Sequence, residues 1–340
     1  MKVLITGGTG YIGSHTVVEF QNSGYEVIII DNLSNSDIKV LNGIEKISGK
    51  KPEFHNIDLT EKDKLNSFFR NNKDFDVVIH FAAFKAVGES VKLPLKYYNN
   101  NVVGMINLLD AMQTANINNI VFSSSCTVYG ESNDLPVTEE SPIIPAKSPY
   151  GFTKQIGERL LEDITASTDL NAISLRYFNP IGAHDSALIG ELPLGVPNNL
   201  VPFITQTAIG IRKELTVYGN DYDTLDGTNI RDYIHVVDLA KAHVSAAERI
   251  VNEQKREKLE VFNLGTGIGN SVLEVIRTFE KVSGEKLNYN IGPRREGDVV
   301  AIYSDTRKAS KILKWKTERD LENSLQSAWK WEQALKQKAN

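Results

Sequence analysis

The stretch Val3-Leu4-Ile5-Thr6-Gly7-Gly8-Thr9-Gly10-Tyr11-Ile12-Gly13 decides the predicted fold. The apolar run Val3 to Thr6 predicts a buried strand, and a helical pattern begins at about Gly13. The glycines between the two permit a tight turn and close packing of the helix on the strand. The chain therefore opens with a strand, a tight turn and a helix, as a parallel α/β sheet does.

Further short apolar runs alternate with longer helical patterns along the first half of the chain. They predict four more strands, at Glu26 to Ile30, Val77 to Phe81, Ile120 to Ser124 and Asn171 to Phe178. A strand, helix, strand order repeated this often predicts an α/β fold with a doubly wound parallel sheet, a Rossmann domain.

The residue pattern of the sequence changes after Asn179, where frequent prolines and glycines predict short elements joined by loops. We therefore expect a Rossmann domain over residues 1–178 and a smaller, mixed α/β domain over residues 179–340. Arg231 to Ala247 reads as a strand followed by a helix. We expect a segment near residues 231–250 to pack back on the first domain.

Composition limits the classes of partner. A net charge of -5 and a pI near 5.8 give no general attraction to nucleic acid or to an anionic membrane, so neither is expected as a partner. No apolar run approaches the length of about 20 residues that a membrane span needs. The only cysteine is Cys126, and the chain begins Met-Lys-Val with a glycine turn soon after, which together favour a reducing cytoplasm.

The glycine turn predicts a dinucleotide site. Gly7, Gly10 and Gly13 let a pyrophosphate approach the backbone at the start of the helix, where the N-terminus attracts phosphate. Asp31 ends the second strand, 18 residues after Gly13, and its carboxylate suits the adenosine ribose while repelling the extra phosphate of NADP. Because Asn32, Leu33 and Ser34 include no arginine, we expect NAD as the cofactor.

Two acidic residues near this turn have alternative readings. Asp31 can instead be a loop-capping acid. Asp58 and Leu59, after a third apparent strand, can reach the adenine, although an exposed turn acid is the competing reading of Asp58.

A second motif predicts proton-transfer chemistry. Tyr150 and Lys154 lie four residues apart at the start of a helix, so both side chains project from one face. We expect Phe152, Ile156, Leu160 and Ile164 to form the buried stripe of that helix. The Lys154 ammonium and a bound nicotinamide both favour the phenolate, so we expect a lowered pKa that makes Tyr150 a general base.

Ser125 completes this candidate catalytic set. It follows a strand, where open α/β sheets bind ligands, and its hydroxyl can share a proton with Tyr150. Alone, the pair Tyr150 and Lys154 would more often be a half-exposed tyrosine beside a solvated lysine. Cys126 is interpreted as a packing residue, and the six histidines show no metal-ligand spacing, so no metal is expected.

At this point the sequence resembles the extended short-chain dehydrogenase/reductase family and, within it, the UDP-glucose 4-epimerases, over nearly its full length. The motifs that carry the resemblance are TGGTGYIGSH (6–15), HFAAFKAVGESV (80–91), SSSCTVYG (123–130), SPYGFTK (148–154), RYFNPIG (176–182), NNL (198–200), RDYIHVVD (231–238) and PRREGD (293–298).

The resemblance also implies sets of contact residues. Those implied for NAD are Tyr11, Ile12, Asp31, Asn32, Leu33, Ser34, Asn35, Ser36, Asp58, Leu59, Phe81, Ala82, Ala83, Phe84, Lys85, Asn100, Ser125, Tyr150, Lys154 and Phe178. Those implied for a UDP-sugar are Lys85, Ser125, Tyr150, Asn179, Asn199, Leu200, Thr216, Val217, Tyr218, Arg231, Arg295, Asp298 and Ile302. Arg231 and Arg295 suit a diphosphate, although a surface ion pair is the plain alternative for either.

The implied reaction interconverts UDP-glucose and UDP-galactose through a transient 4-keto sugar, in galactose metabolism or in supplying UDP-galactose for glycans. One rival is a nucleotide-sugar 4,6-dehydratase, whose relatives look to carry an Asp-Glu pair where this chain has Cys126 and Thr127. Another is a silent NAD-binding regulator, against which Ser125, Tyr150 and Lys154 argue. The resemblance further implies a homodimer, and it makes Ile302 the gate beside the sugar C2 substituent, with packing of the domain core as the alternative.

Overall fold

The structure is a computed structural model, and it describes residues 1–132, 134–254, 257–295 and 298–339. Glu296 and Gly297, within the motif over residues 293–298, lie outside the described residues.

A seven-stranded sheet with the order β10-β6-β5-β4-β1-β2-β3 forms the larger part of the molecule, and every neighbouring pair in it is parallel. This confirms the predicted doubly wound α/β fold. Its strands are β1 (Lys2–Thr6), β2 (Glu26–Asp31), β3 (Glu53–Asn56), β4 (Val77–His80), β5 (Asn119–Ser125), β6 (Asn171–Tyr177) and β10 (Leu259–Leu264).

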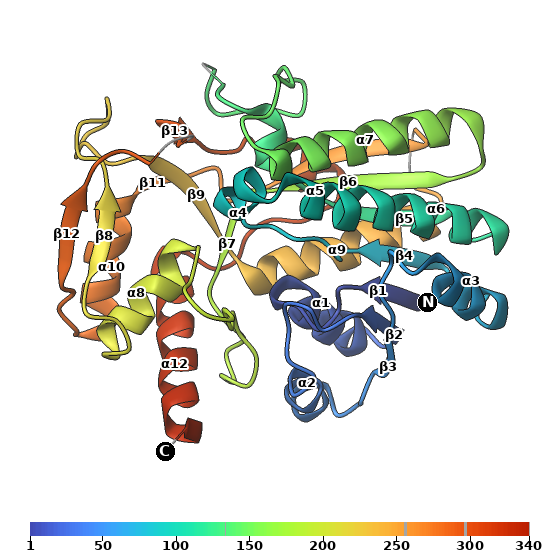
Figure 1. Cartoon of the computed structure of the whole chain (residues 1–340), viewed down its shortest axis with the longest axis horizontal. Helices are drawn as coiled ribbons and strands as arrows, with labels where there is room; N and C mark the ends of the chain where they lie inside the picture. The colour runs from blue at the N-terminus through green and yellow to red at the C-terminus, as the bar shows by residue number, and fades with distance from the viewer. Residues whose placement is uncertain (133, 255–256, 296–297, 340) are drawn as a thin grey trace.

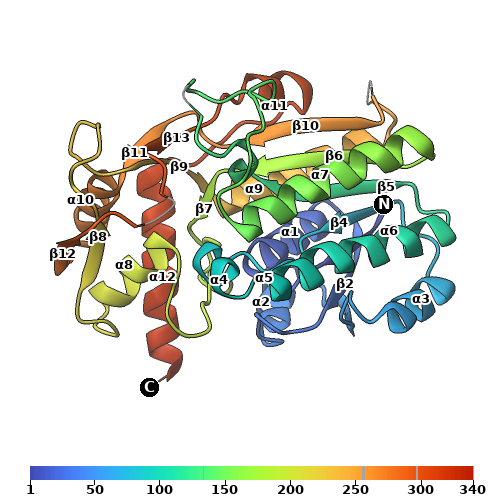
Figure 2. The same ribbon diagram turned by 45° about the horizontal axis from the view of Figure 1, so that its top comes forward.

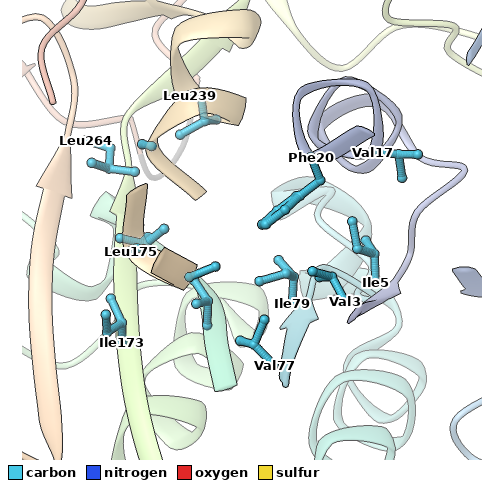
Figure 3. Packing of buried hydrophobic residues seen from close by; sticks show 14 of the residues in the cluster. Val3, Ile5, Val17, Phe20, Val77, Ile79, Ile173, Leu175, Leu239 and Leu264 are labelled. Atoms are coloured by element: carbon cyan, nitrogen blue, oxygen red, sulfur yellow. The ribbon is translucent and has the colours of Figure 1, made fainter. Parts of the chain in front are cut away.

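Helices cover both faces of this sheet because successive side chains of each strand point to opposite sides. Val3 and Ile5 of β1 pack in a cluster with residues of α1 (Tyr11–Asn22), α2 (Val40–Ser48) and α9 (Val236–Val251), part of which Figure 3 shows. Leu4 packs in the opposite cluster, with α3 (Lys62–Asn71), α6 (Gly104–Thr114) and α7 (Pro149–Ser167). Both faces are buried, as parallel sheets require.

Short elements connect this layer. They are α4 (Val87–Lys92), α5 (Pro94–Tyr97), a π-helical turn η1 (Tyr98–Val103), a 3-10 turn η2 (Cys126–Tyr129) and α11 (Arg307–Ile312).

The second half of the chain builds a smaller α/β unit, seen at one end of the molecule in Figures 1 and 2. Its apolar core gathers residues such as Ile204, Val217, Tyr233, Phe279 and Trp329. Its elements are β7 (Asn179–Ile181), α8 (Leu200–Ala208), β8 (Leu215–Tyr218), β9 (Ile230–His235), β11 (Gly269–Ser271), α10 (Val272–Ser283), β12 (Tyr289–Gly292), β13 (Ala301–Ile302) and α12 (Leu321–Ala339).

Two elements that follow residue 178 belong to the large layer. Helix α9 packs beside α1, and its Leu239 lies in the same cluster as Val3. Strand β10 pairs with β6 at the edge of the large sheet, a position that the sequence analysis did not foresee. The chain therefore returns to the first layer after entering the second.

The expected buried stripe of α7 is wrong at Phe152, whereas Leu160 and Ile164 are partly buried against the core. Phe152 is 46% exposed, and Ile156, Leu160 and Ile164 are only partly buried. The buried face carries smaller and polar residues instead, among them Gly157, Glu158 and Lys154. Gly157 is needed there because a Cβ would lie 2.5 Å from the Phe122 ring of β5. Close approach to the sheet, rather than apolar character, selects this face of α7.

Across residues 1–132, 134–254, 257–295 and 298–339, no helix is both long enough and apolar enough to cross a membrane.

Candidate active site

The order of the large sheet reverses between β1 and β4, which is the point where doubly wound sheets open a crevice at their carboxyl ends. The glycine turn leaves β1 here, and the segment from Phe81 leaves β4 here. The two are in contact: a Cβ on Gly7, whose φ is +74°, would lie 2.7 Å from the Ala82 nitrogen. Gly13 is equally constrained, since its Cβ would lie 2.2 Å from the Gly7 carbonyl oxygen.

Helix α1 points its N-terminus at this crevice. Gly10 is the N-cap residue, no side chain caps the helix, and no acidic residue lies in its first turn. The helix N-terminus therefore keeps its partial positive charge and its open N–H groups for an anion. Tyr11 and Ile12 begin the helix, and the Tyr11 hydroxyl donates a 2.6 Å hydrogen bond to the Gly182 carbonyl oxygen in the smaller unit.

Asp31 is buried at the carboxyl end of β2, and its carboxylate organises the loop that follows. It accepts hydrogen bonds from Thr9 N at 3.2 Å, Leu33 N at 2.9 Å and the Ser36 hydroxyl at 3.3 Å. Leu33 has a φ of +57°, a conformation unusual for a residue with a side chain, and the bond to Asp31 holds it there. The capping reading of Asp31 is thus realised in the structure, alongside its place at the crevice. Ser34 and Asn35 are exposed in the same loop.

Asp58 lies beside this loop. Its carboxylate accepts from Asn32 Nδ2 at 2.7 Å and from the Thr60 hydroxyl at 2.6 Å. Burial raises the pKa of Asp58, but these hydrogen bonds outweigh it and hold the pKa below its ordinary value. The next residue, Leu59, is buried against the helices of that face.

The segment Phe81 to Lys85 forms the other wall of the crevice. Phe84 N donates to Asn101 Oδ1 at 2.8 Å, and Asn101 Nδ2 donates to Thr153 Oγ1 at 3.1 Å. Asn101 and the expected NAD contact Asn100 both lie on the π-helical turn η1, a geometry frequent at functional sites. Asn101 and Thr153 were missed by the sequence analysis, and the run of asparagines at 99–101 is the only signal that pointed to either.

Ser125, Tyr150 and Lys154 meet at the carboxyl end of β5. Ser125 is the last residue of β5 and caps η2 by accepting from Thr127 N at 3.2 Å. Lys154 is 5% exposed, and its Nζ donates to the Ser123 carbonyl oxygen at 2.5 Å. Tyr150 is the second residue of α7 and shares a hydrogen bond with the Ser125 side chain. The three residues therefore form one polar cluster, in which Ser125 and Lys154 are buried and Tyr150 is half-buried.

The pKa of the Tyr150 phenol is raised in the chain without a nicotinamide, so the expected lowering depends on the bound cofactor and stays a prediction. Burial raises the pKa of the phenol to about 12, because a phenolate loses its hydration there, and the hydrogen bond with Ser125 offsets only part of that rise. Burial also lowers the pKa of Lys154 to about 8, against the opposing charge of Glu158 one turn further along α7.

A second polar cluster lies between the two units of the molecule. Asn199, just before α8, donates from Nδ2 to Glu191 Oε1 at 2.6 Å, and Lys85 Nζ lies 3.1 Å from the same oxygen. Leu200 begins α8. Glu191 was missed by the sequence analysis, and nothing in its local sequence singles it out.

A third cluster holds the two candidate arginines. Asp298 Oδ1 lies 3.7 Å from Arg231 Nη2 and 2.8 Å from Arg295 Nη2. The Arg295 guanidinium also lies 5.7 Å from the ring centroid of Tyr218. Thr216 is half-buried on the same strand, whereas the Val217 side chain is buried in the core of the smaller unit, so only its main chain can reach a ligand.

Ile302 connects these clusters. It pairs with Arg231 across β13 and β9, and it is 5% exposed. Its side chain packs in a cluster with Cys126, next to Ser125, and with Phe178 at the end of β6. Asn179, which follows Phe178, pairs with Tyr233 across β7 and β9. Ile302 therefore packs against η2, the turn that directly follows Ser125, and is paired with the strand that carries Arg231.

No group of three or more histidine, cysteine, aspartate or glutamate side chains is arranged for a metal ion in the described part of the chain.

Comparison with known proteins places the chain in a family. Residues 4–328 match the family described as GDP-mannose 4,6 dehydratase. The chain is 49% identical over 333 residues to the UDP-glucose 4-epimerase of Bacillus subtilis, covering 98% of this chain and 97% of that protein.

Solved structures agree. The UDP-glucose 4-epimerase of Stenotrophomonas maltophila, with bound NAD and formylated UDP-arabinopyranose, superposes with a TM-score of 0.96 at 46% identity, covering 99% of both chains. That of Bifidobacterium longum, in complex with NAD+ and UDP, superposes with a TM-score of 0.94 at 46% identity, covering 98% of both chains. The chain therefore belongs to the GDP-mannose 4,6 dehydratase family of extended short-chain dehydrogenase/reductases and, within it, to the UDP-glucose 4-epimerases, which are isomerases that use NAD.

Proposed function

We propose that this chain interconverts UDP-glucose and UDP-galactose by reversible epimerisation at C4 of the sugar, through a transient 4-keto sugar. The observation that carries the proposal is the polar cluster of Ser125, Tyr150 and Lys154 at the same edge of the sheet as the glycine turn. That arrangement joins proton transfer to a dinucleotide site. Relatives that are 46–49% identical carry the epimerase name.

The residues at the crevice fit NAD. A Cβ at Gly7 or Gly13 of the glycine turn would clash with neighbouring backbone, and the N-terminus of α1 is open to a pyrophosphate. The Asp31 carboxylate at the end of β2 favours an unmodified ribose. When bound, NAD supplies the hydride acceptor and donor that reaction at C4 requires. We accordingly assign residues 1–178 mainly to NAD and the later residues, apart from α9 and β10, mainly to the UDP-sugar.

Tyr150 moves the proton. Its phenol oxygen takes the proton of the sugar 4-hydroxyl and returns it when the 4-keto sugar is reduced on its other face. Because burial raises the pKa of this phenol to about 12 in the protein by itself, the positive charges of Lys154 and of a bound nicotinamide are needed to bring it toward neutral pH. Ser125 shares the proton through its hydroxyl.

The UDP moiety is assigned to the smaller unit. Arg231 and Arg295 already converge on Asp298, and their guanidinium groups suit the oxygens of a diphosphate in a chain of net negative charge. Asn179, Asn199 and Leu200 border the same region between the two units.

The family description leaves a dehydratase as the rival. Dehydration after oxidation at C4 needs an acid to expel the 6-hydroxyl and a base at C5. The two residues after Ser125 are Cys126, whose thiol pKa burial raises to about 12, and Thr127. Neither can serve as a carboxylic acid, which favours epimerisation.

We further infer a homodimer and a cytoplasmic location. The outward faces of α7 and its neighbours expose Phe152, Ile106, Val103 and Leu95, and apolar side chains grouped in this way favour burial against a second copy. The cytoplasmic location is inferred from the single cysteine, Cys126, which cannot form a disulfide within the chain.

The deciding experiment is incubation with UDP-galactose and NAD, with products resolved by NMR. UDP-glucose is the expected product. A dehydrated 4-keto sugar would establish the dehydratase instead, and no reaction would favour the silent NAD-binding regulator.

A further inference from the structure

Glu191 lies where the two units of the molecule meet, and its carboxylate contacts both. Its Oε1 lies 3.1 Å from Lys85 Nζ, on the segment that leaves β4 of the large sheet. The same oxygen accepts a 2.6 Å hydrogen bond from Asn199 Nδ2, just before α8 of the smaller unit. The Glu191 side chain is 14% exposed, so these two groups replace much of its hydration.

The backbone of Glu191 is fixed by contacts with α12. Its carbonyl oxygen accepts a 2.9 Å hydrogen bond from Trp331 Nε1 of α12. The preceding residue, Gly190, bridges to Ala183 and packs so closely on the Trp331 ring that a Cβ would lie 2.6 Å from it. Packing on α12 therefore fixes the backbone of Glu191, while the carboxylate at the end of its side chain is held by Lys85 and Asn199.

The contact of Asn199 with Glu191 replaces a helix-capping hydrogen bond. Asn199 occupies the N-cap position of α8, where an asparagine side chain ordinarily accepts from the second or third N–H of the helix. No such capping bond is present, because the side chain is directed to Glu191. The amide is thus held in an orientation that the helix by itself would not select.

Lys85 also contacts the start of α1, in the large unit. Its Nζ lies 5.8 Å from the centroid of the Tyr11 ring, at the start of α1. The Tyr11 hydroxyl in turn donates to the Gly182 carbonyl oxygen. The Lys85 ammonium therefore lies near the Tyr11 ring at the start of α1 and also contacts Glu191.

We propose that Glu191 is a positioning residue that fixes Lys85 and Asn199 relative to each other and thereby couples the NAD site to the UDP-sugar site. The inference rests on the proposed function, in which Lys85 contacts both ligands and Asn199 contacts the UDP-sugar. A ligand that orders either side chain also orders Glu191, and so prepares the other side chain for its own ligand. Such coupling is reciprocal, so each ligand must tighten the binding of the other by the same factor.

The test compares the full-length chain with its Glu191→Ala and Glu191→Gln variants. The dissociation constant of NAD is measured by titration with and without saturating UDP. We expect UDP to tighten NAD binding by a factor of about 5 to 150 in the parent chain, and this factor to fall toward one in Glu191→Ala. Glu191→Gln keeps a neutral acceptor, so an intermediate factor is expected, and this variant decides the matter if Glu191→Ala does not fold.

Steady-state kinetics supply a second readout. A residue with a merely structural role would not change KM while leaving kcat unchanged. Because Lys85 and Asn199 act on binding rather than on the reacting atoms, the KM for UDP-galactose is expected to rise about tenfold or more in Glu191→Ala, with kcat little changed. The matched control is Glu318→Gln, which removes the carboxylate of an exposed pair with Lys241 far from the expected ligand contacts. It is expected to keep the parent KM and the parent coupling factor.

The outcomes separate this inference from the proposed function. A coupling factor of one in the parent, or an unchanged factor in both Glu191 variants, overturns the role of Glu191. If the parent binds NAD and UDP with a coupling that the variants lose, yet does not epimerise UDP-galactose, the role of Glu191 stands and the proposed function fails.

Discussion

The Nζ of Lys154 lies 2.5 Å from the main-chain carbonyl oxygen of Ser123, two residues before Ser125 on β5. This hydrogen bond fixes a buried cation at the end of the strand from which Ser125 reaches Tyr150. Burial lowers the pKa of Lys154 to about 8, so the side chain carries its charge mainly below that pH.

Replacing Lys154 by alanine removes the charge that favours the Tyr150 phenolate. The apparent pKa of Tyr150 is therefore expected to rise, and the acidic limb of the pH–rate profile to move to higher pH. NAD binding is expected to weaken as well. The control is Lys147→Ala, which removes an exposed lysine paired with Glu131. An acidic limb that stays in place in Lys154→Ala contradicts the coupling.

Tyr150→Phe removes the hydroxyl and keeps the ring. Turnover of UDP-galactose is expected to fall by about 10² to 10⁴, the usual range for losing a general base. Binding of NAD and UDP, measured by calorimetry, is expected to persist because the ring still fills its site. A near-normal rate would remove Tyr150 from the mechanism.

Asp31→Ala is expected to lose the preference for NAD over NADP, because the repulsive carboxylate is gone. The structure adds a matched variant. Asp31→Asn removes the charge while its Oδ1 can still accept from Leu33 N, so the loop is kept. The ratio of the two dissociation constants is expected to shift toward NADP by about tenfold or more. Discrimination lies elsewhere if both variants reject NADP as strongly as the parent does.

Ile302 is expected to set the width of the sugar pocket. Its β-branched side chain is stiff but shorter than tyrosine, so UDP-glucose and UDP-galactose are the expected main substrates, with weak activity on N-acetylated sugars. A mismatch of about one methylene is worth roughly 1 to 3 kcal/mol. Ile302→Tyr should abolish the N-acetyl activity and Ile302→Ala should raise it. The gate is misassigned if both variants keep the parent ratio of kcat/KM for the two sugar classes.

Acid is expected to destabilise the fold below about pH 6.5. Burial lowers the pKa of His15, His80 and His235 to about 3 and that of His243 to about 4, from an unfolded value of 6.5. Between these values the unfolded chain binds more protons than the native one, so stability rises with pH and is lost on acidification. Each histidine contributes at most about 1.4 kcal/mol per pH unit. Three carboxyls whose pKa is raised by loss of hydration act in the opposite direction, namely Glu19, Glu139 and Glu332.

Denaturant unfolding at pH 7, 6 and 5 measures this slope. His80→Asn keeps a polar partner for the Thr6 hydroxyl but cannot take up a proton, so its slope should be smaller than that of the parent. A free energy of unfolding that does not change over this range contradicts the prediction.

The sequence predicted those parts of the fold that depend on local patterns. The strands β1, β2, β4, β5 and β6 lie at or within about two residues of their predicted ranges, because parallel strands buried on both faces are continuous apolar runs. The glycine turn could also be predicted from the sequence, since its backbone geometry requires glycine at Gly7 and Gly13.

Long-range packing accounts for what the sequence analysis got wrong or missed. Periodicity on α7 selected the apolar residues around Phe152, whereas the structure buries the face with Gly157 and Lys154, because a glycine at position 157 lets this helix approach Phe122 of β5. Strand β10 joins the sheet beside β6 although more than 80 residues separate the two in the chain.

The sequence by itself determined the doubly wound sheet, the glycine turn and the chemical groups available at the candidate site, since these follow from residue type and short spacing. Only the tertiary structure decided which of those groups meet and in which state. It removed part of the Tyr150 side chain from water and so raised the pKa of the phenol, and it placed Glu191 between Lys85 and Asn199, with Lys85 106 residues away in sequence. Burial and long-range contact depend on how distant segments pack, and no local pattern in the sequence encodes them.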